Sequence, residues 1–355
     1  MNAPPLEILH VYLTRSCNLQ CEHCWINASR TYPMVELEDK YFLNAFNEAL
    51  DLGLDTLFIS GGEPLLRSDL AITLIKVANN SKVKTVLETN GTLITPPLLK
   101  ELAKYEIDIS LSLDFPSEVE FNAFRHGKRV YRRVLDVIPK LRDLGIPPVV
   151  VVSVFNRNLH SIFEITDLIM SLGAKAVKFN PILPIGRARH NNISLSVSQY
   201  QTLIEYLIQL YDKYPGKIWS MVPHYLLAKY GRRYLNISRM ACNYTKMLGI
   251  LPDGGVSLCG IGIEYPETVI GNIKEESLRD IWYSGRGFLG ELRRVKPDEF
   301  QGICSGCILR SYCANICPAF AYEEYKSFTA SFPVCQKLFE EGVFPHEFID
   351  PSVLR

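Results

Sequence analysis

The sequence lacks several features of membrane, secreted and nucleic-acid-binding proteins. Its 38 Lys and Arg residues balance its 38 Asp and Glu residues, so no overall basic field favours nucleic acid as a partner. No apolar run approaches the roughly 20 residues that span a bilayer. Residues 1–7 lack the charged and then apolar pattern of a signal peptide. We therefore expect a cytoplasmic protein that binds neither nucleic acid nor a membrane.

A Rossmann fingerprint is also missing, although strands and helices alternate along the first half of the chain. Short apolar, β-branched runs predict six strands, at 8–13, 56–60, 85–89, 107–113, 149–154 and 176–181. Amphipathic stretches predict helices between them, at 36–52, 98–105, 131–144 and 162–172. This alternation is typical of a parallel sheet covered by helices. We expect an α/β fold with a partial (β/α)6 barrel of the TIM type, in which the loops after the strands build the active site.

The pattern changes after residue 187. Ser196-Val-Ser-Gln199 predicts a capping box that opens a helix, and Pro215-Gly216 ends that helix. From Cys242 onward, periodicity is weak and cysteines are frequent, and such a region is most simply held together by metal. We expect a barrel domain at 1–212, a helical bridge at 213–240 and a small, irregular metal-binding domain at 241–355.

Ten cysteines in a chain without a signal peptide point to metal ligation, because disulfides do not persist in a reducing compartment. Three of them, Cys17, Cys21 and Cys24, lie in one loop directly after the first predicted strand. Three thiolates can hold one face of an iron–sulfur cube and leave one iron open for chemistry. Zinc or free thiols are the alternatives. Zinc usually takes four protein ligands, and only His23 lies nearby as a fourth.

Three polar turns follow other predicted strands. They are Gly61-Gly62-Glu63-Pro64, Thr89-Asn90-Gly91 and Ser110-Leu-Ser112-Leu-Asp114. Each alone has the composition of an ordinary strand-to-helix turn. Their common position, at strand ends beside the cysteine loop, makes them candidates for binding a ligand. The two glycines allow close approach to the backbone, and Glu63 can accept bonds from an ammonium group.

The cysteine loop, the Gly-Gly-Glu-Pro turn and the six strand–helix units together resemble the radical S-adenosylmethionine (radical SAM) enzymes, over roughly residues 8–190. In that family three thiolates hold a [4Fe–4S] cluster, SAM chelates its open iron, and reduction releases a 5′-deoxyadenosyl radical. The resemblance implies that the cluster ligands are Cys17, Cys21 and Cys24. It also implies a SAM-binding set of Gly61, Gly62 and Glu63 at the amino group, Asn90, Ser112 and Ser153 at the ribose or carboxylate, and His23 near the adenine.

The C-terminal cysteines resemble the SPASM extension of these enzymes, which holds two auxiliary iron–sulfur clusters. The resemblance implies an outer cluster, expected as [4Fe–4S], on Cys304, Cys307, Cys313 and Cys335. It implies an inner cluster on Cys242, Cys259 and Cys317. A zinc ribbon stays open as an alternative, because Cys-x2-Cys pairs also suit zinc.

Three ligands for the first cluster, four for the outer and three for the inner use all ten cysteines. The inner cluster is therefore one cysteine short of four. Some relatives have a fourth cysteine near the position of Cys242, and residues 234–247 contain no other. We hypothesise an inner cluster with an open iron, or a smaller or differently ligated one, with a substrate thiolate, water, Tyr244 or Tyr265 as the further ligand. No general base can be named from the sequence. Arg125 and Arg187 are candidate carboxylate anchors.

Enzymes with this extension mostly modify ribosomally made peptides or protein side chains. The resemblance therefore favours a radical SAM oxidoreductase that forms a thioether or carbon–carbon crosslink in a peptide. Oxidation or decarboxylation of a small molecule in cofactor or tetrapyrrole biosynthesis is the second hypothesis, and a non-catalytic iron–sulfur electron carrier is the third. The first strand begins within ten residues of Met1, without room for a leader-recognition module. Expected partners are thus the peptide, a separate leader-peptide-recognition protein and an electron donor such as flavodoxin or ferredoxin.

Overall fold

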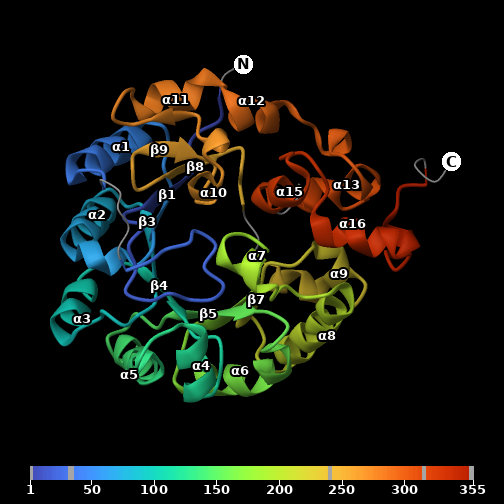
Figure 1. Cartoon of the computed structure of the whole chain (residues 1–355), viewed down its shortest axis with the longest axis horizontal. Coiled ribbons are helices and arrows are strands. Elements are labelled where there is room, and N and C mark those ends of the chain that lie inside the picture. Colours follow the sequence, from blue (N-terminus) through green and yellow to red (C-terminus); the bar gives the residue numbers. More distant parts are fainter. Residues whose placement is uncertain (1–2, 31–35, 239–241, 314–316, 352–355) are drawn as a thin grey trace.

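The computed structural model describes residues 3–30, 36–238, 242–313 and 317–351. Their strands form one sheet in the order β10-β9-β8-β1-β2-β3-β4-β5-β6-β7, with helices around its outer side (Figure 1). Pairing is parallel from β8 through β1 to β7, and antiparallel between β8, β9 and β10. The strands are β1 (Ile8–Tyr12), β2 (Thr56–Ser60), β3 (Lys84–Thr89), β4 (Asp108–Ser112), β5 (Val149–Val154), β6 (Ala176–Pro181), β7 (Ile218–Ser220), β8 (Met247–Ile250), β9 (Gly255–Ser257) and β10 (Gly271–Asn272).

The expected α/β fold with a parallel sheet is confirmed. All six predicted strands and all four helices predicted between them are present, and the structure adds α2, α4 and α7. In α1, the predicted apolar face is the buried one, because Phe42, Ala45, Phe46 and Ala49 all pack inward. The helices of this part are α1 (Asp39–Asp51), α2 (Ser68–Asn80), α3 (Pro96–Leu102), α4 (Glu118–Phe124), α5 (Val130–Asp143), α6 (Ile162–Ser171), α7 (Arg187–Asn191) and α8 (Val197–Lys213).

The capping box that opens α8 is confirmed. The backbone N–H of Gln199 donates to the Ser196 hydroxyl at 3.2 Å, and the Ser196 N–H donates to the Gln199 side chain at 3.0 Å. The expected bridge at 213–240 is not only helical. It contains β7, which extends the sheet beside β6, before α9 (His224–Ala228) and the 3-10 helix η3 (Arg232–Ile237).

The C-terminal part consists mostly of short helices and shares the sheet of the N-terminal part. Its strand β8 pairs with β1 from Ile8 opposite Met247 to Val11 opposite Ile250. Among the described helices, none is both long enough and apolar enough to cross a membrane. The helices here are α10 (Ile261–Glu264), α11 (Leu278–Ser284), α12 (Gly287–Arg294), α13 (Ile303–Gly306), α14 (Arg310–Cys313), α15 (Pro318–Tyr325) and α16 (Pro333–Glu340).

Candidate active site

The three-cysteine loop follows β1 and is held by the segment that follows β6. Arg187 donates from Nε to the carbonyl of Cys21 and from Nη1 to that of Ala28, each at 2.7 Å. The preceding Gly186 has φ of +59°, and a Cβ there would lie 2.5 Å from the carbonyl oxygen of Trp25. Both contacts fix the path of the loop. Backbone carbonyls use two of the donors of the Arg187 guanidinium, and its candidate role as a carboxylate anchor stays a prediction.

The thiols of this loop lie in an environment that favours their protonated form. Burial raises the pKa of Cys17 to about 12 and that of Cys21 to about 11. Arg125 opposes this shift, with Nη1 3.8 Å from the Cys21 sulfur, and is itself paired with buried Asp114 at 2.6 Å. Thiolates here need positive charge beyond Arg125, and a bound metal cluster supplies such charge. The donor set thus fits an iron–sulfur cluster.

A cavity of about 310 Å³ lies in front of the cysteine loop. It brings together residues from several loops and strands that the sequence placed in one site. The predicted residues that line it are Cys17, Cys21, His23, Cys24, Gly61, Gly62, Asn90, Ser112 and Ser153. The glycines serve a purpose that was not predicted, because a Cβ on Gly62 would lie 2.1 Å from the carbonyl oxygen of Ser16. They let the turn pack directly against the cysteine loop.

Glu63 and Asn90 form a buried hydrogen-bond network at this cavity, which Asn90 lines. The Glu63 carboxylate accepts from the Thr89 hydroxyl at 2.7 Å and from the Asn90 N–H at 2.8 Å. Burial raises its pKa, and these bonds oppose the shift. The Asn90 amide donates to Asn18 at 2.9 Å, which ties the third strand's turn to the cysteine loop. The structure therefore gives both residues a part in shaping the site, and their contacts with SAM stay a prediction.

His23 presents a flat, neutral ring beside the cavity. The ring is stacked on Phe124, with centroids 4.8 Å apart and an angle of 10° between the planes. Burial, reinforced by the charge of Arg125, lowers the pKa of His23 to about 3. An uncharged aromatic surface fits the predicted place beside an adenine, which stays a prediction.

Sequence reasoning missed the polar residues on the inner wall of the sheet. Glu88 of β3, together with Lys178 and Asn180 of β6, lines the same cavity. The signal was available, because polar residues alternate with buried apolar ones within these strands. The sequence prediction considered only the residues at the ends of the strands.

The four cysteines predicted for the outer cluster surround a common space. Cys304, Cys307, Cys313 and Cys335 all line one cavity of about 20 Å³, walled by aromatic rings. Burial raises the pKa of Cys313 to about 12. His224 was not predicted here, yet its Nδ1 lies 3.3 Å from the Cys313 sulfur. In the described part of the chain, no three Cys, His, Asp or Glu side chains meet closely enough to hold a single metal ion.

The three cysteines predicted for the inner cluster also share one environment. Burial raises the pKa of Cys259 to about 12, and the charge of Cys317 adds to the shift. The pKa of Cys242 rises by burial and then through the charges of Cys317 and Cys259. Tyr244 is buried, and the charge of Cys242 helps to raise its pKa to about 12. Their roles as ligands stay predictions.

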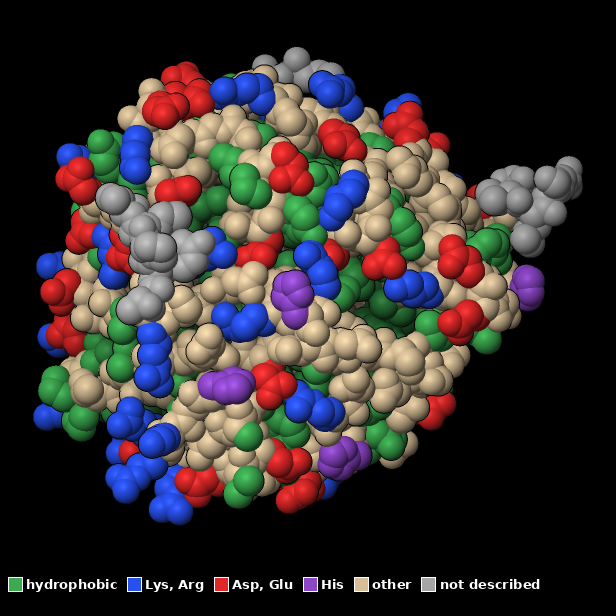
Figure 2. All heavy atoms as spheres, viewed as in Figure 1, with side chains coloured by type: hydrophobic (Ala, Val, Ile, Leu, Met, Phe, Trp, Pro, Cys, Tyr) green, Lys and Arg blue, Asp and Glu red, His purple; other side chains and the backbone are tan. Residues whose placement is uncertain are grey.

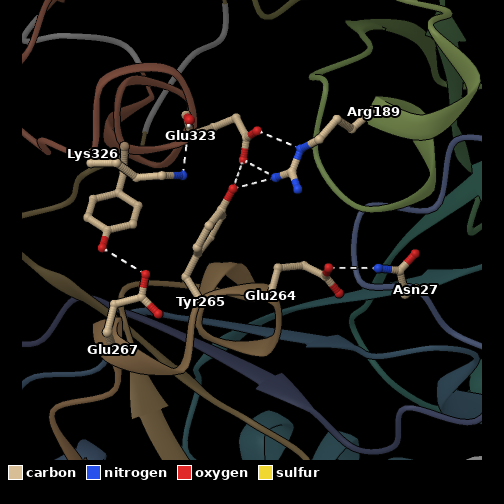
Figure 3. A network of polar contacts seen from close by, with 8 residues as sticks. Asn27, Arg189, Glu264, Tyr265, Glu267, Glu323 and Lys326 are labelled. Atoms are coloured by element: carbon tan, nitrogen blue, oxygen red, sulfur yellow. Dashed lines mark hydrogen bonds and ion pairs between the residues drawn. The ribbon is translucent and has the colours of Figure 1, made fainter.

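Polar contacts join the N-terminal part to the C-terminal part (Figure 3). Arg189 of α7 pairs with Glu323 of α15 through bonds of 2.8 and 2.6 Å, and Tyr265 bonds to both side chains. Asn27, which follows the cysteine loop, donates to Glu264 of α10 at 2.6 Å. The Tyr265 hydroxyl is thus used by this network, which removes it as a candidate ligand of the inner cluster.

A groove of about 320 Å³ lies between the loop after β6 and helix α16. Figure 2 shows hydrophobic side chains in a hollow at this place, between the regions of α7 and α16. Cys317 and Phe320 line the groove, with Tyr200 and Phe332. The segment 181–183 lines both this groove and the cavity at the cysteine loop, so the two spaces have a wall in common.

Residues 11–169 match the model of the Radical SAM superfamily, and residues 242–308 match that of the SPASM iron–sulfur cluster-binding domain. The chain belongs to the radical SAM superfamily and carries a SPASM domain. As a radical SAM enzyme it binds a [4Fe–4S] cluster and SAM, and it cleaves SAM. This excludes the hypothesis of a non-catalytic electron carrier.

Relatives of this radical SAM enzyme have names that point to different reactions. The AdoMet-dependent heme synthase of Methanosarcina barkeri is 29% identical over 94% of this chain and 97% of its own length. The PqqA peptide cyclase of Rhizobium meliloti is 27% identical over 94% of this chain and 87% of its own. Among solved structures, Streptococcus suis SuiB bound to its precursor peptide SuiA has a TM-score of 0.75 at 19% identity, and the match covers 94% of this chain and 76% of that one. The likeness to SuiB supports the same fold.

Proposed function

We propose that this radical SAM enzyme modifies a side chain of a ribosomally made peptide in the cytoplasm, by forming a thioether or carbon–carbon crosslink. The proposal rests on one observation. The groove and the cavity at the cysteine loop have a wall in common. Segment 181–183 borders both spaces, and Cys317 of the inner group lines the groove. An extended apolar peptide fits such a path, because it can lie in the groove and turn one side chain toward the cavity.

The relatives support a peptide substrate. PqqA peptide cyclase bears that substrate in its name, and SuiB was solved with its precursor peptide. We assign the first cluster to Cys17, Cys21 and Cys24, the outer cluster to the four thiols around the small cavity, and the inner cluster to Cys242, Cys259 and Cys317. The inner set of three leaves a place for a further ligand, which a peptide thiolate or Tyr244 can fill.

The chain's own residues bind, orient and shield. Cys17, Cys21 and Cys24 would hold the cluster, and SAM bound to it would supply a 5′-deoxyadenosyl radical for removing a hydrogen atom from the substrate. Arg187 and Gly186 fix the loop that carries the first three thiols. Glu63 and Asn90 fix the turns beside it. A flavodoxin or ferredoxin is the proposed electron donor, and a separate leader-peptide-recognition protein is a proposed partner.

A second candidate is the oxidation or decarboxylation of a tetrapyrrole. The match with the heme synthase of Methanosarcina barkeri favours it, because that match spans nearly the whole of both chains. Lys178 in the cavity offers an ammonium group that can bind a carboxylate.

The test is co-expression of the chain with short peptides encoded beside its gene, followed by mass spectrometry. We expect a peptide to lose two mass units per crosslink, and Cys17→Ala to abolish the loss. Reconstituted enzyme with dithionite and SAM is expected to release 5′-deoxyadenosine. If every peptide keeps its mass while a carboxylate-bearing porphyrin is altered, the second candidate replaces the first.

A further inference from the structure

We propose that Glu88 is the base that accepts the substrate's proton when the crosslink forms, with Lys178 as its positioning partner. The inference rests on the proposed peptide modification and supplies the base that the sequence did not reveal. Both side chains line the cavity at the cysteine loop, on the inner wall of the sheet.

The atom balance of a crosslink requires such a base. Joining an S–H and a C–H group into a C–S bond removes two hydrogens. One leaves carbon as a hydrogen atom and forms the new C–H bond of 5′-deoxyadenosine. The other leaves sulfur as a proton, and the remaining electron passes to a one-electron acceptor of the iron–sulfur class. The proton needs an acceptor within reach of the cavity.

Few ionisable side chains line this cavity apart from the thiols. They are His23, Glu88, Arg125, Lys178 and Arg187. The arginines stay protonated in proteins, and both are occupied, by buried Asp114 and by backbone carbonyls. His23 belongs to the cysteine loop and is stacked on Phe124. Glu88 and Lys178 remain.

The Glu88 side chain lines the cavity without a bonding partner in the part of the chain that the structure describes. In the described residues, neither the Glu88 nor the Lys178 side chain forms a hydrogen bond or an ion pair, and only their backbones pair in the sheet. Their ionisable neighbours are each other, His10 and Tyr12, because the charges of Glu88 and Lys178 act on the pKa of His10 and the charge of Glu88 acts on that of Tyr12. The Nδ1 of His10 and the Oδ1 of Asn180 are buried and have no hydrogen-bond partner among the described residues. The inner wall therefore carries unused polar groups, which is the arrangement expected where a substrate group completes the bonding.

The two partners have distinct parts in this arrangement. Glu88 extends from β3, where it lies opposite Ser110 of β4, and Lys178 extends from β6, opposite Val151 of β5. Burial lowers the pKa of Lys178, and the negative charge of Glu88 raises it. The opposite charge of Lys178 attracts the Glu88 carboxylate and so biases where that side chain lies on the cavity wall.

The base also separates the two candidate functions. Oxidative loss of a carboxylate from a propionate group removes a hydrogen atom, carbon dioxide and an electron, and it releases no proton. Glu88 as a base therefore belongs to peptide crosslinking and has no task in that decarboxylation.

The test compares Glu88→Gln with the wild-type enzyme, on the peptide whose mass the wild type changes, deuterated at the reacting carbon. We expect 5′-deoxyadenosine to form and to carry deuterium, and the peptide KM to stay unchanged. The kcat for crosslinking should fall by about 100-fold or more. The substrate radical should accumulate and be visible by EPR. Lys178→Met should lower kcat less, and the surface change Glu106→Gln should leave it unchanged.

Crosslinking by Glu88→Gln at the wild-type rate would overturn the proposal. So would loss of 5′-deoxyadenosine in that variant at wild-type iron content and SAM binding, because Glu88 would then act before the proton leaves. Glu88→Asp, which keeps a carboxylate, should restore part of kcat and guards against misfolding. If the wild type changes no peptide, the proposed function fails first and the role of Glu88 fails with it.

Discussion

At the scale of the residue, Gly186 illustrates how one backbone position supports the metal site. Its φ of +59° lies in the left-handed region, and an added Cβ would meet the carbonyl oxygens of Trp25 and Cys24 at 2.5 and 2.7 Å. We predict that Gly186→Ala displaces the cysteine loop and removes about four irons per chain, the content of one [4Fe–4S] cluster. Iron analysis of anaerobically purified protein measures this.

Gly216→Ala is the matched control for that prediction. Gly216 also has positive φ, at +75°, but an added Cβ would meet no atom within 4 Å. It should lower the free energy of unfolding by about 1 kcal/mol and leave the iron content intact. Equal iron content in both variants would show that the contact with Trp25 does not position the loop.

His10 provides a prediction about pH. Burial lowers its pKa from the usual 6.5, so the fold favours the neutral ring. Between the two pKa values the unfolded chain binds more protons, and the free energy of unfolding therefore rises with pH. The contribution of the neutral His10 ring to the free energy of unfolding is complete above pH 6.5 and is lost as the pH falls below 6.5. His10→Phe keeps the stacking on Phe58, at 4.3 Å between centroids, and removes the titration.

We expect the stability of the wild type to fall by about 1 kcal/mol more than that of His10→Phe between pH 7.5 and pH 5.5. Thermal unfolding without oxygen, at both pH values, measures the difference. His160→Gln, at an exposed position, should follow the wild type. Parallel curves for wild type and His10→Phe would argue against a buried, neutral ring.

The residues of the site were predictable where chemistry and chain position coincide. The thiols and the polar turns lie at strand ends, and their residue types indicate what they can bind. The use of Arg187 by loop carbonyls and the position of Glu88 depend on contacts between residues far apart in sequence. The same holds for Tyr265. Its hydrogen bonds to Arg189 and Glu323 could not be predicted from the residues next to it in the sequence.

At the scale of elements, the ion pair between α7 and α15 joins the two parts of the enzyme. The Arg189 side chain is 43% exposed and that of Glu323 is 9% exposed. We predict a coupling of about 1 kcal/mol in a double-mutant cycle of Arg189→Met and Glu323→Gln, measured by thermal unfolding. The surface pair Lys140 and Asp136 should give about 0.5 kcal/mol or less. Equal couplings would mean that the α7–α15 contact adds nothing beyond a surface pair.

The longer elements were predictable because their periodicity is local. Strands β2, β5 and β6 have the predicted bounds, and α6 differs by one residue. Strands β7 and β8 span three and four residues, too few for a periodic signal. Their place in the sheet follows from pairing with β6 and β1, and those partners are distant in the sequence.

At the scale of the whole molecule, the shared sheet makes the C-terminal part a support of the N-terminal part. Strand β8 covers the edge of β1, and the backbone N–H groups of Glu7 and Ile8 both donate to the carbonyl of Lys246. The buried indole of Trp282 also donates to the carbonyl of Pro4 at 2.9 Å. The first strand, which leads into the cysteine loop, is thereby held from both sides.

We predict that a chain ending at residue 240 does not fold as an independent barrel. Without β8, the edge of β1 exposes backbone groups that pair readily with other chains. Size-exclusion chromatography should show aggregates, and circular dichroism should show no cooperative thermal transition. Co-expression of residues 241–355 as a separate chain should restore a soluble complex, because the same sheet can form between two fragments. A monomeric fragment 1–240 that unfolds cooperatively would contradict the prediction and would mean that β1 holds its place through β2 alone.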